Sequence, residues 1–176
     1  AEMRAIVEEA GRHGLEVAAH AHGHEGILAA FHAGVSSIEH GSMVDAAAIA
    51  LMKERGTFLV PTTHLADAIN LDALPGPIRA KAEWLLPRAK DNLRLAIAGG
   101  VKIAFGTDAA VIPHGTNAAE FVALVQRGMQ PAQALQAATI RAAELCRTPD
   151  RGRIAPGLLA DLVAVPGNPL TDITAM

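Results

Sequence analysis

Aromatic residues are scarce in this sequence. Phe, Trp and Tyr make up only 3% of the 176 residues, and Tyr is absent. This argues against a stacking platform for single-stranded nucleic acid, which needs several aromatic rings. The net charge of −3 and the lack of a basic stripe also argue against nucleic-acid partners. Hydrophobic residues reach 51% and charged residues 19%, so the sequence predicts a folded globular protein.

Cysteine is almost absent too. Cys146 stands alone in the sequence, so it has no partner for an internal disulfide, and this favours a cytoplasmic location. No apolar run reaches the ~18 residues of a membrane span, and no signal-peptide pattern opens the sequence. We therefore expect no membrane partner. The sequence begins at Ala1 without an initiator Met, which suggests a piece of a longer protein.

A unit of helix, glycine and short apolar strand recurs along the chain. The predicted strands are 17–19, 35–39 and 57–60, each after a glycine that ends a helical pattern. A fourth strand is predicted at 101–105, after another pair of glycines. Short, wholly apolar strands that alternate with amphipathic helices are typical of a parallel sheet covered on both faces. The sequence therefore predicts the α/β fold class.

The connection between the third and fourth strands is unusually long. Residues 64–98 predict a helical region that is broken at 74–77. Such connections usually have about 2–6 residues, and long insertions often form lids. We therefore expect this region to cover the mouth of a site or its rim, with 84–86 as an apolar anchor. Two more helices are predicted at about 117–127 and 131–146.

The chain changes character near residue 147. No long helical pattern follows, and 160–165 is typical of a β-strand. We therefore divide the chain into a domain at 1–146 and a β tail at 147–176. The four predicted core strands are half of the eight in a (β/α)₈ barrel, which takes ~250 residues. The sequence thus predicts either a small open sheet or half of a barrel.

Polar side chains gather where the predicted strands end. The ends of parallel strands lie at one edge of the sheet, where the sites of α/β folds are found. Imidazole and carboxylate are the usual ligands of Zn²⁺ and similar ions, so His20, His40 and Asp108 form a candidate metal site. A structural role for each of them is the alternative that spacing alone leaves open. The strand-end residues are His20, His22, His40, Thr62, Thr63, His64, Thr107 and Asp108.

Other histidines call for separate interpretations. His114 lies in a loop directly after Asp108, so we expect it to contact substrate, with bracing of the loop as the alternative. His13 and His32 lie near predicted helix ends, where the helix dipole favours a partly charged imidazole. We interpret both as structural.

Several motifs occur in an order that resembles the amidohydrolase superfamily, within it the imidazolonepropionase-related and Xaa-Pro dipeptidase-like enzymes. Together the motifs cover nearly the whole chain. The resemblance implies the C-terminal half of a (β/α)₈ TIM-type barrel, strands 5–8, plus a tail that belongs to a small β-domain built from both chain ends. The matching segments are Val17–Gly23, Ser37–Gly41, Phe105–Ala109, Pro113–Asn117, Gly152–Gly157 and Ala160–Val165.

The resemblance also implies roles for individual residues. His20 corresponds to the fifth-strand metal ligand, and His40 to the sixth-strand His that binds a second metal or stabilises the transition state. Asp108 corresponds to the eighth-strand Asp that binds metal and shuttles the proton. The implied cofactor is Zn²⁺ or another divalent metal, as one or two ions. Three further histidines remain candidates for substrate binding, of which the first is the less favoured ligand of its pair: His22, His64 and His114.

The implied reaction is metal-assisted, dipeptidase-like hydrolysis of an amide or peptide-type C–N bond in a small substrate. A cyclic-amide hydrolase or deaminase is the alternative within the superfamily. A non-catalytic α/β module or self-associating fragment is the alternative outside the enzymes. The superfamily's first-strand His-x-His and fourth-strand Lys are missing from this sequence, so we expect little turnover from the isolated chain. A nucleotide-binding open sheet is disfavoured because 21–26 lacks a Gly-rich phosphate loop.

Half of a barrel would leave two sheet edges open and its inward apolar face exposed. We therefore expect the chain to form a homo-oligomer or to associate with a separately supplied N-terminal half. The residues predicted on the inward face are Val17, Ala19, Ile38, Phe58, Val60, Ile103 and Phe105.

Overall fold

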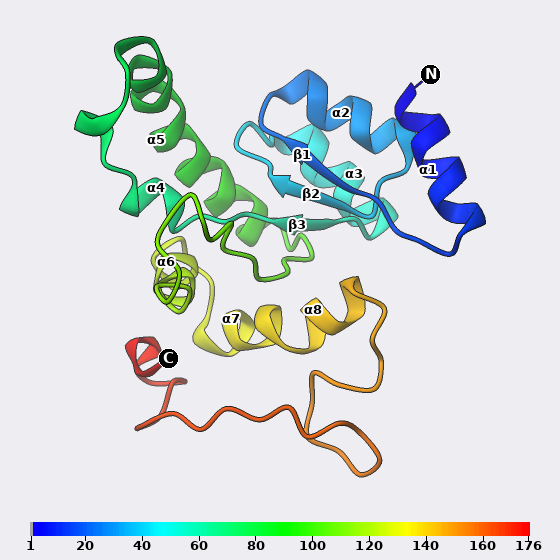
Figure 1. Cartoon of the computed structure of the whole chain (residues 1–176), viewed down its shortest axis with the longest axis vertical. Helices are drawn as coiled ribbons and strands as arrows, with labels where there is room; N and C mark the ends of the chain where they lie inside the picture. The colour runs from blue at the N-terminus through cyan, green and yellow to red at the C-terminus, as the bar shows by residue number, and fades with distance from the viewer. Residues whose placement is uncertain (1) are drawn as a thin grey trace.

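The computed structural model describes residues 2–176 as a parallel sheet surrounded by helices (Figure 1). The sheet has three strands in the order β1-β2-β3, which confirms the α/β class. The elements in chain order are α1 (Glu2–Arg12), β1 (Ala18–Ala21), α2 (His24–Ala33), β2 (Ser37–His40), α3 (Ala46–Arg55), β3 (Phe58–Val60), α4 (Leu65–Ala68), η1 (Leu71–Ala73), α5 (Gly76–Ala98), α6 (Ala119–Gln126), α7 (Pro131–Ala138), α8 (Ile140–Leu145) and η2 (Ile173–Ala175).

Glycines end the helices that precede β2 and β3, as the sequence predicts. Gly34 follows α2 with φ 94°, and Gly56 follows α3 with φ 69°. This left-handed conformation turns the chain into the next strand and is costly for most other residues. Ala21 of β1 is in register with His40 of β2, so the carboxyl ends of these strands lie side by side.

The core lies between the sheet and the helices packed on it. Ile38 of β2 and Leu59 of β3 are buried together with Phe31 of α2 and Met52 of α3. Burying one such large apolar side chain contributes about 1.5–3 kcal/mol. This packing holds the strands in place, and with them the residues at their ends.

The predicted fourth strand is reduced to a single bridge beside β3. Leu59 N–H donates to Lys102 O at 2.9 Å, and Ala104 N–H donates to Leu59 O at 3.1 Å. Phe105 N–H, which follows a donor that points to β3, lies on the opposite side and bonds to Ala137 O of α7 at 3.1 Å. The prediction of a full strand is therefore wrong. The next ladder bond to this segment would need a backbone N–H at residue 61, and Pro61 has none.

The long connection after β3 is helical, which confirms the prediction for this region. It consists of α4, η1 and α5, and α5 (green in Figure 1) stands beside the carboxyl edge of the sheet. Leu85 and Leu86 line a cavity there, as expected of an apolar anchor. Trp84 does not belong to this anchor, because it is 50% exposed and lies under the Arg88 guanidinium.

The two helices predicted after the fourth strand are three in the structure. The first is α6, and the second is divided into α7 and α8 at Thr139. The Thr139 hydroxyl donates to Leu135 O at 2.7 Å, a backbone contact of the kind that bends helices. Within residues 2–176, no helix is both long and apolar enough to cross a membrane.

The face predicted to point into a barrel is largely covered. Leu145 of α8 packs against a small cluster that includes Phe58 and Val60 of β3. The prediction that this face is exposed is therefore wrong for four of its seven residues, which are buried. The other three, Val17, Ala19 and Phe105, are partly buried. The buried ones are Ile38, Phe58, Val60 and Ile103.

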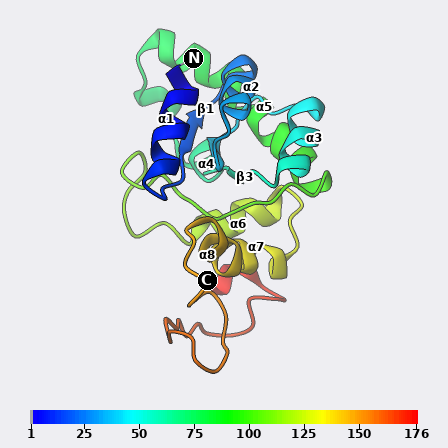
Figure 2. The same cartoon turned by 90° about the vertical axis from the view of Figure 1, so that its right-hand side faces the viewer.

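The strand predicted at 160–165 does not form. Figure 2 shows the tail running away from the helices, and Leu162 and Val163 are 65% and 83% exposed. A strand needs a neighbour for its backbone N–H and C=O groups, and the described residues place none beside this segment. At the end of the tail, η2 packs back on α6 and buries Ile173.

Candidate functional site

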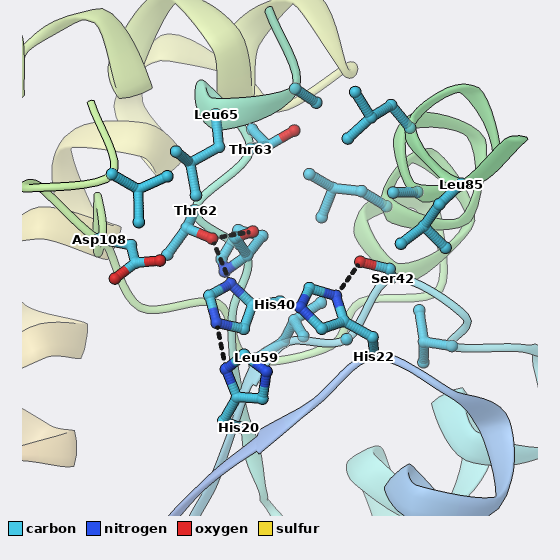
Figure 3. A pocket seen from close by; sticks show the side chains of 18 of the residues that line it. His20, His22, His40, Ser42, Leu59, Thr62, Thr63, Leu65, Leu85 and Asp108 are labelled. Carbon is cyan, nitrogen blue, oxygen red and sulfur yellow. Dashed lines mark hydrogen bonds between the residues drawn. The ribbon is translucent and has the colours of Figure 1, made fainter. Parts of the chain in front are cut away.

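A cavity of about 330 Å³ opens between the carboxyl edge of the sheet and the α4–α5 region (Figure 3). His20, His22, His40 and Asp108 all line it. Its volume falls in the range of ~300–1,000 Å³ that is usual for small-molecule sites. The predicted strand-end residues therefore meet at a space that a small ligand could enter.

Three imidazole rings face one another at this cavity. The ring centroids of His20 and His40 are 4.6 Å apart, those of His20 and His22 are 4.8 Å apart, and those of His22 and His40 are 4.7 Å apart. His20 and His22 point the same way because they are two residues apart in an extended segment. One ligand atom from each ring lies within 4.8 Å of the other two, a group that could hold a metal ion.

Neighbouring hydroxyl groups orient two of these rings. His40 Nδ1 lies 2.7 Å from Thr62 Oγ1, and the Thr62 hydroxyl donates to Pro61 O at 2.8 Å. Since the hydroxyl proton is committed, Thr62 accepts from His40 Nδ1–H, which leaves the His40 Nε2 lone pair facing the cavity. His22 Nδ1 lies 2.7 Å from Ser42 Oγ, so this ring also has a hydroxyl group as hydrogen-bond partner. Such partners hold the rings of metal-binding histidines in place.

Left-handed backbone conformations recur at these strand ends. The φ angles are 68° at His40, 48° at Thr62 and 51° at Asp108. Each costs a residue other than glycine about 1–3 kcal/mol, and such residues cluster at functional sites. The strand ends thus keep a strained geometry that presents their side chains to the cavity.

Burial keeps the central imidazoles neutral. It lowers the pKa of His40 to about 4, aided by the nearby His22 and His20 and opposed by Asp108. Burial and the neighbouring His20 also lower the pKa of His22. Both rings are therefore uncharged at neutral pH, so each carries one nitrogen lone pair that could bind a cation.

Asp108 lies at the rim of the cavity and is exposed. Figure 3 shows it beside Thr62, on the side of the cavity away from His22. The chain reaches this place by passing close to β3 at Gly106, where a Cβ atom would collide with Val60. The group of three histidines that could hold a metal ion does not include Asp108, so a carboxylate lies next to this group at the same cavity.

Two predicted substrate-binding residues lie elsewhere. The backbone N–H of His64 donates to Glu120 Oε2 at 2.6 Å, and the residue does not line the cavity. His114 is exposed in its loop and does not line the cavity either. Their contact with substrate stays a prediction.

Sequence reasoning missed Glu120, which is fully buried at the start of α6. Its carboxylate accepts from Thr63 N–H at 2.9 Å as well as from His64 N–H, and so fixes the loop that follows Thr62. Burial raises the pKa of Glu120 to about 7, although these hydrogen bonds and Arg127 favour the ionised form. A Glu in a first helical turn is typical of a surface position, so the sequence carried no signal for this role.

The Amidohydrolase family matches this chain over residues 1–176. Ochratoxinase from Aspergillus niger is 40% identical to it over 98% of this chain, which spans 37% of that protein. Imidazolonepropionase from Salinispora tropica is 38% identical over 57% of this chain and 28% of its own length.

Solved structures show the same similarity. A crystal structure of a Xaa-Pro dipeptidase with methionine bound in the active site gives a TM-score of 0.94 at 47% identity, over 99% of this chain and 44% of that one. The crystal structure of A. niger ochratoxinase gives a TM-score of 0.90 at 38% identity, over 99% of this chain and 40% of that one. The chain therefore spans less than half the length of these relatives.

Proposed function

Since the chain belongs to the amidohydrolase family, we propose that it carries the metal-binding C-terminal half of an amide-hydrolysing (β/α)₈ enzyme. Its three strands and the bridged segment at 101–105 would be strands 5–8 of that barrel. The share of the Xaa-Pro dipeptidase that it covers, 44%, supports this interpretation. Residues 147–176 would complete a small β-domain together with chain outside these residues, which would explain their unpaired backbone.

The convergence of three histidines carries the proposal. Neutral imidazoles are good ligands for Zn²⁺, and His40 and His22 have hydrogen-bond partners of the kind that orient ligands. The donor set therefore fits Zn²⁺ or a similar divalent ion, with His20 and His40 as the predicted ligands and His22 as a third nitrogen. When bound, such an ion would polarise an amide carbonyl and make water a stronger nucleophile.

The remaining chemistry falls to residues of the chain. Asp108, the carboxylate predicted both to bind metal and to move the proton, would take a proton from the attacking water and deliver it to the leaving nitrogen. The Thr62 hydroxyl would hold the His40 ring in position through its Nδ1–H.

The substrate would be a small amide or dipeptide, as the names of the Xaa-Pro dipeptidase and ochratoxinase relatives suggest. The imidazolonepropionase relative favours a cyclic amide as the second candidate.

Metal titration of the purified chain tests this proposal. We expect Zn²⁺ to bind at one site, and Co²⁺ to give a visible absorption band typical of nitrogen ligands. His20→Ala and His40→Ala should each weaken binding by about tenfold or more. His32→Ala is the matched control, because His32 is exposed on α2 and lies outside the cluster. Equal loss in the control, or no saturable binding to the folded chain, would overturn the proposal.

A further inference from the structure

The cavity beside the three histidines has a second, apolar part. We propose that this part is a subsite for an uncharged apolar group of the substrate, aliphatic or aromatic, held next to the bond to be cleaved. The inference rests on the proposed function, because it assumes an amide substrate. The subsite itself consists of apolar side chains that bind no metal.

The walls of the subsite come from the region that follows β3. Leu65 lies in α4, Ile69 follows it, and Leu85, Leu86 and Ala89 lie on α5. Figure 3 shows Leu65 and Leu85 on the side of the cavity opposite the His20 and His40 rings. A ligand with its polar centre at the imidazoles would therefore extend an attached group between aliphatic side chains.

Three charged side chains of this region pair with one another. Lys90 Nζ lies 2.8 Å from Asp67 Oδ1, and Arg127 donates to both oxygens of the same carboxylate at 2.8 and 2.7 Å. Among the described residues, Asp108 at the rim is the one carboxylate that lines the cavity, and no lysine, arginine or glutamate lines it. A charged ligand group buried against the leucines would find no counter-ion there, so the subsite selects against it.

The size of the cavity sets the expected gradient of affinity. About 330 Å³ leaves room for a side chain as large as leucine beside an amide group. Each buried methylene should tighten binding about fourfold. Branched aliphatic and aromatic groups should therefore bind better than alanine, and Lys or Asp side chains should bind no better than alanine.

Methyl NMR titration of the 176-residue chain tests this, with and without Zn²⁺. The probes are the N-acetyl amides of L-leucine, L-alanine, L-lysine and L-aspartate. We expect the leucine probe to bind at least about tenfold tighter than the others and to shift the Leu85, Leu86 and Ala89 methyl signals.

Two substitutions on one helix separate the subsite from general effects. Leu86→Gln should weaken the leucine probe about tenfold, whereas Leu95→Gln, at a 57% exposed position of α5, should leave it unchanged. Ala89→Leu fills the cavity without adding polarity and should also abolish the preference for leucine. Circular dichroism and retained methyl dispersion establish that each variant is folded.

The outcomes for the subsite and for the metal site are distinguishable. An apolar preference that persists in a chain that binds no Zn²⁺ would support the subsite and overturn the proposed function. Zn²⁺ binding without any probe binding, or with equal affinity for the leucine and lysine probes, would overturn the subsite alone. An unchanged preference in both Leu86→Gln and Ala89→Leu would overturn it as well.

Discussion

His40 shows how one residue is specified by its surroundings. Its backbone lies in the left-handed region, its Nδ1–H is committed to Thr62, and its Nε2 lies 2.9 Å from His20 Nδ1. Two ring nitrogens this close are compatible with one proton between them or with a shared cation. Burial lowers the pKa of His40 to about 4, so a second proton does not bind this ring at neutral pH. A cation is therefore favoured over a proton at His40 Nε2.

The Thr62 hydroxyl should therefore affect metal binding, although it contacts Nδ1 of His40 and not the Nε2 atom predicted to bind the metal. We expect Thr62→Val to weaken Zn²⁺ binding by about 10–100-fold, because His40 loses the acceptor that fixes its tautomer and orientation. Valine keeps the β-branched shape of threonine, so the backbone strain at φ 48° changes little. Competition titration with a chelating dye measures the effect.

Two further variants complete this test. Thr62→Ser keeps the hydroxyl and should retain most of the affinity. Thr116→Val removes an exposed hydroxyl that donates to Pro113 O and that does not contact His20, His22 or His40, so it should have no effect. Affinity that is the same in Thr62→Val and Thr116→Val would show that the hydroxyl does not orient His40.

Glu120 should make the stability of the chain depend on pH. Burial raises its pKa to about 7, above the ordinary value of 4.5, so the folded state binds more protons between these values. The stabilisation is fully present below about pH 4.5 and is lost as the pH rises through about 7. In urea unfolding, the free energy of unfolding of the unaltered chain should be lower at pH 8 than at pH 5 by on the order of 2–3 kcal/mol. Glu120→Gln should abolish this difference.

An exposed carboxyl group supplies the control for this measurement. The hydrogen bond from Lys102 lowers the pKa of Glu144, so any stabilisation from this group is lost as the pH falls. Glu144→Gln should therefore leave the decline between pH 5 and pH 8 in place. If Glu120→Gln keeps the same decline as the unaltered chain, the burial of this carboxylate is not its cause.

At the scale of elements, α6 acts as the brace of the region that follows β3. Glu120 in the first turn of this helix and Arg127 directly after its last residue are both buried. Glu120 holds the backbone at Thr63 and His64, while Arg127 holds Asp67 of α4. The cavity wall is thus positioned by a helix that does not line it.

We expect the ion pair of this brace to be worth far more than a surface pair. The Arg127 side chain is 3% exposed, so Asp67→Asn would leave a buried charge without its closest counter-ion. The hydrogen bonds from Arg127 and Lys90 outweigh burial and lower the pKa of Asp67, which marks the pair as favourable. The substitution should cost about 3 kcal/mol in urea unfolding and speed hydrogen exchange in α4.

A second aspartate gives the matched control. Asp91 pairs with Arg94 on the exposed side of α5, with side chains 72% and 52% exposed. Asp91→Asn should change the free energy of unfolding by less than about 1 kcal/mol. Comparable losses for the two aspartates would contradict the bracing role of α6.

The sequence predicted the elements whose signals are local. The glycines after α2 and α3 and the apolar runs of β1 to β3 depend on neighbouring residues, and the structure agrees with them. The histidines at the strand ends follow from the same pattern. The tail strand did not form because a strand also needs a partner in space, which Val163 lacks among the described residues. The fourth strand stops at one bridge because Pro61 has no N–H to extend the ladder. The contacts of Thr62 with His40 and of Glu120 with Thr63 and His64 join residues far apart in the sequence, so residue spacing did not predict them.

At the scale of the whole molecule, several backbone and apolar groups lack partners among residues 2–176. β1 pairs with β2 along one edge and has no strand on the other. Exposed apolar side chains are found on α1, including Ile6 at 59%, and on the tail, including Ile154 at 89%. Unpaired edges and exposed apolar groups favour association with another chain.

We expect the purified chain to associate at micromolar concentration, as a homo-oligomer or with a separately supplied N-terminal half. Light scattering should give a mass above the 18.2 kDa of one chain, and the mass should rise with concentration. Val163→Glu should shift the equilibrium toward the monomer, because it places a charge at an 83% exposed apolar position of the tail. Ile78→Glu, at a 56% exposed position on α5, is the control and should leave the mass unchanged. A stable monomer with cooperative unfolding and no binding of a hydrophobic dye would show that the chain satisfies its own sheet, and that the open-sheet module describes it better than half of a barrel.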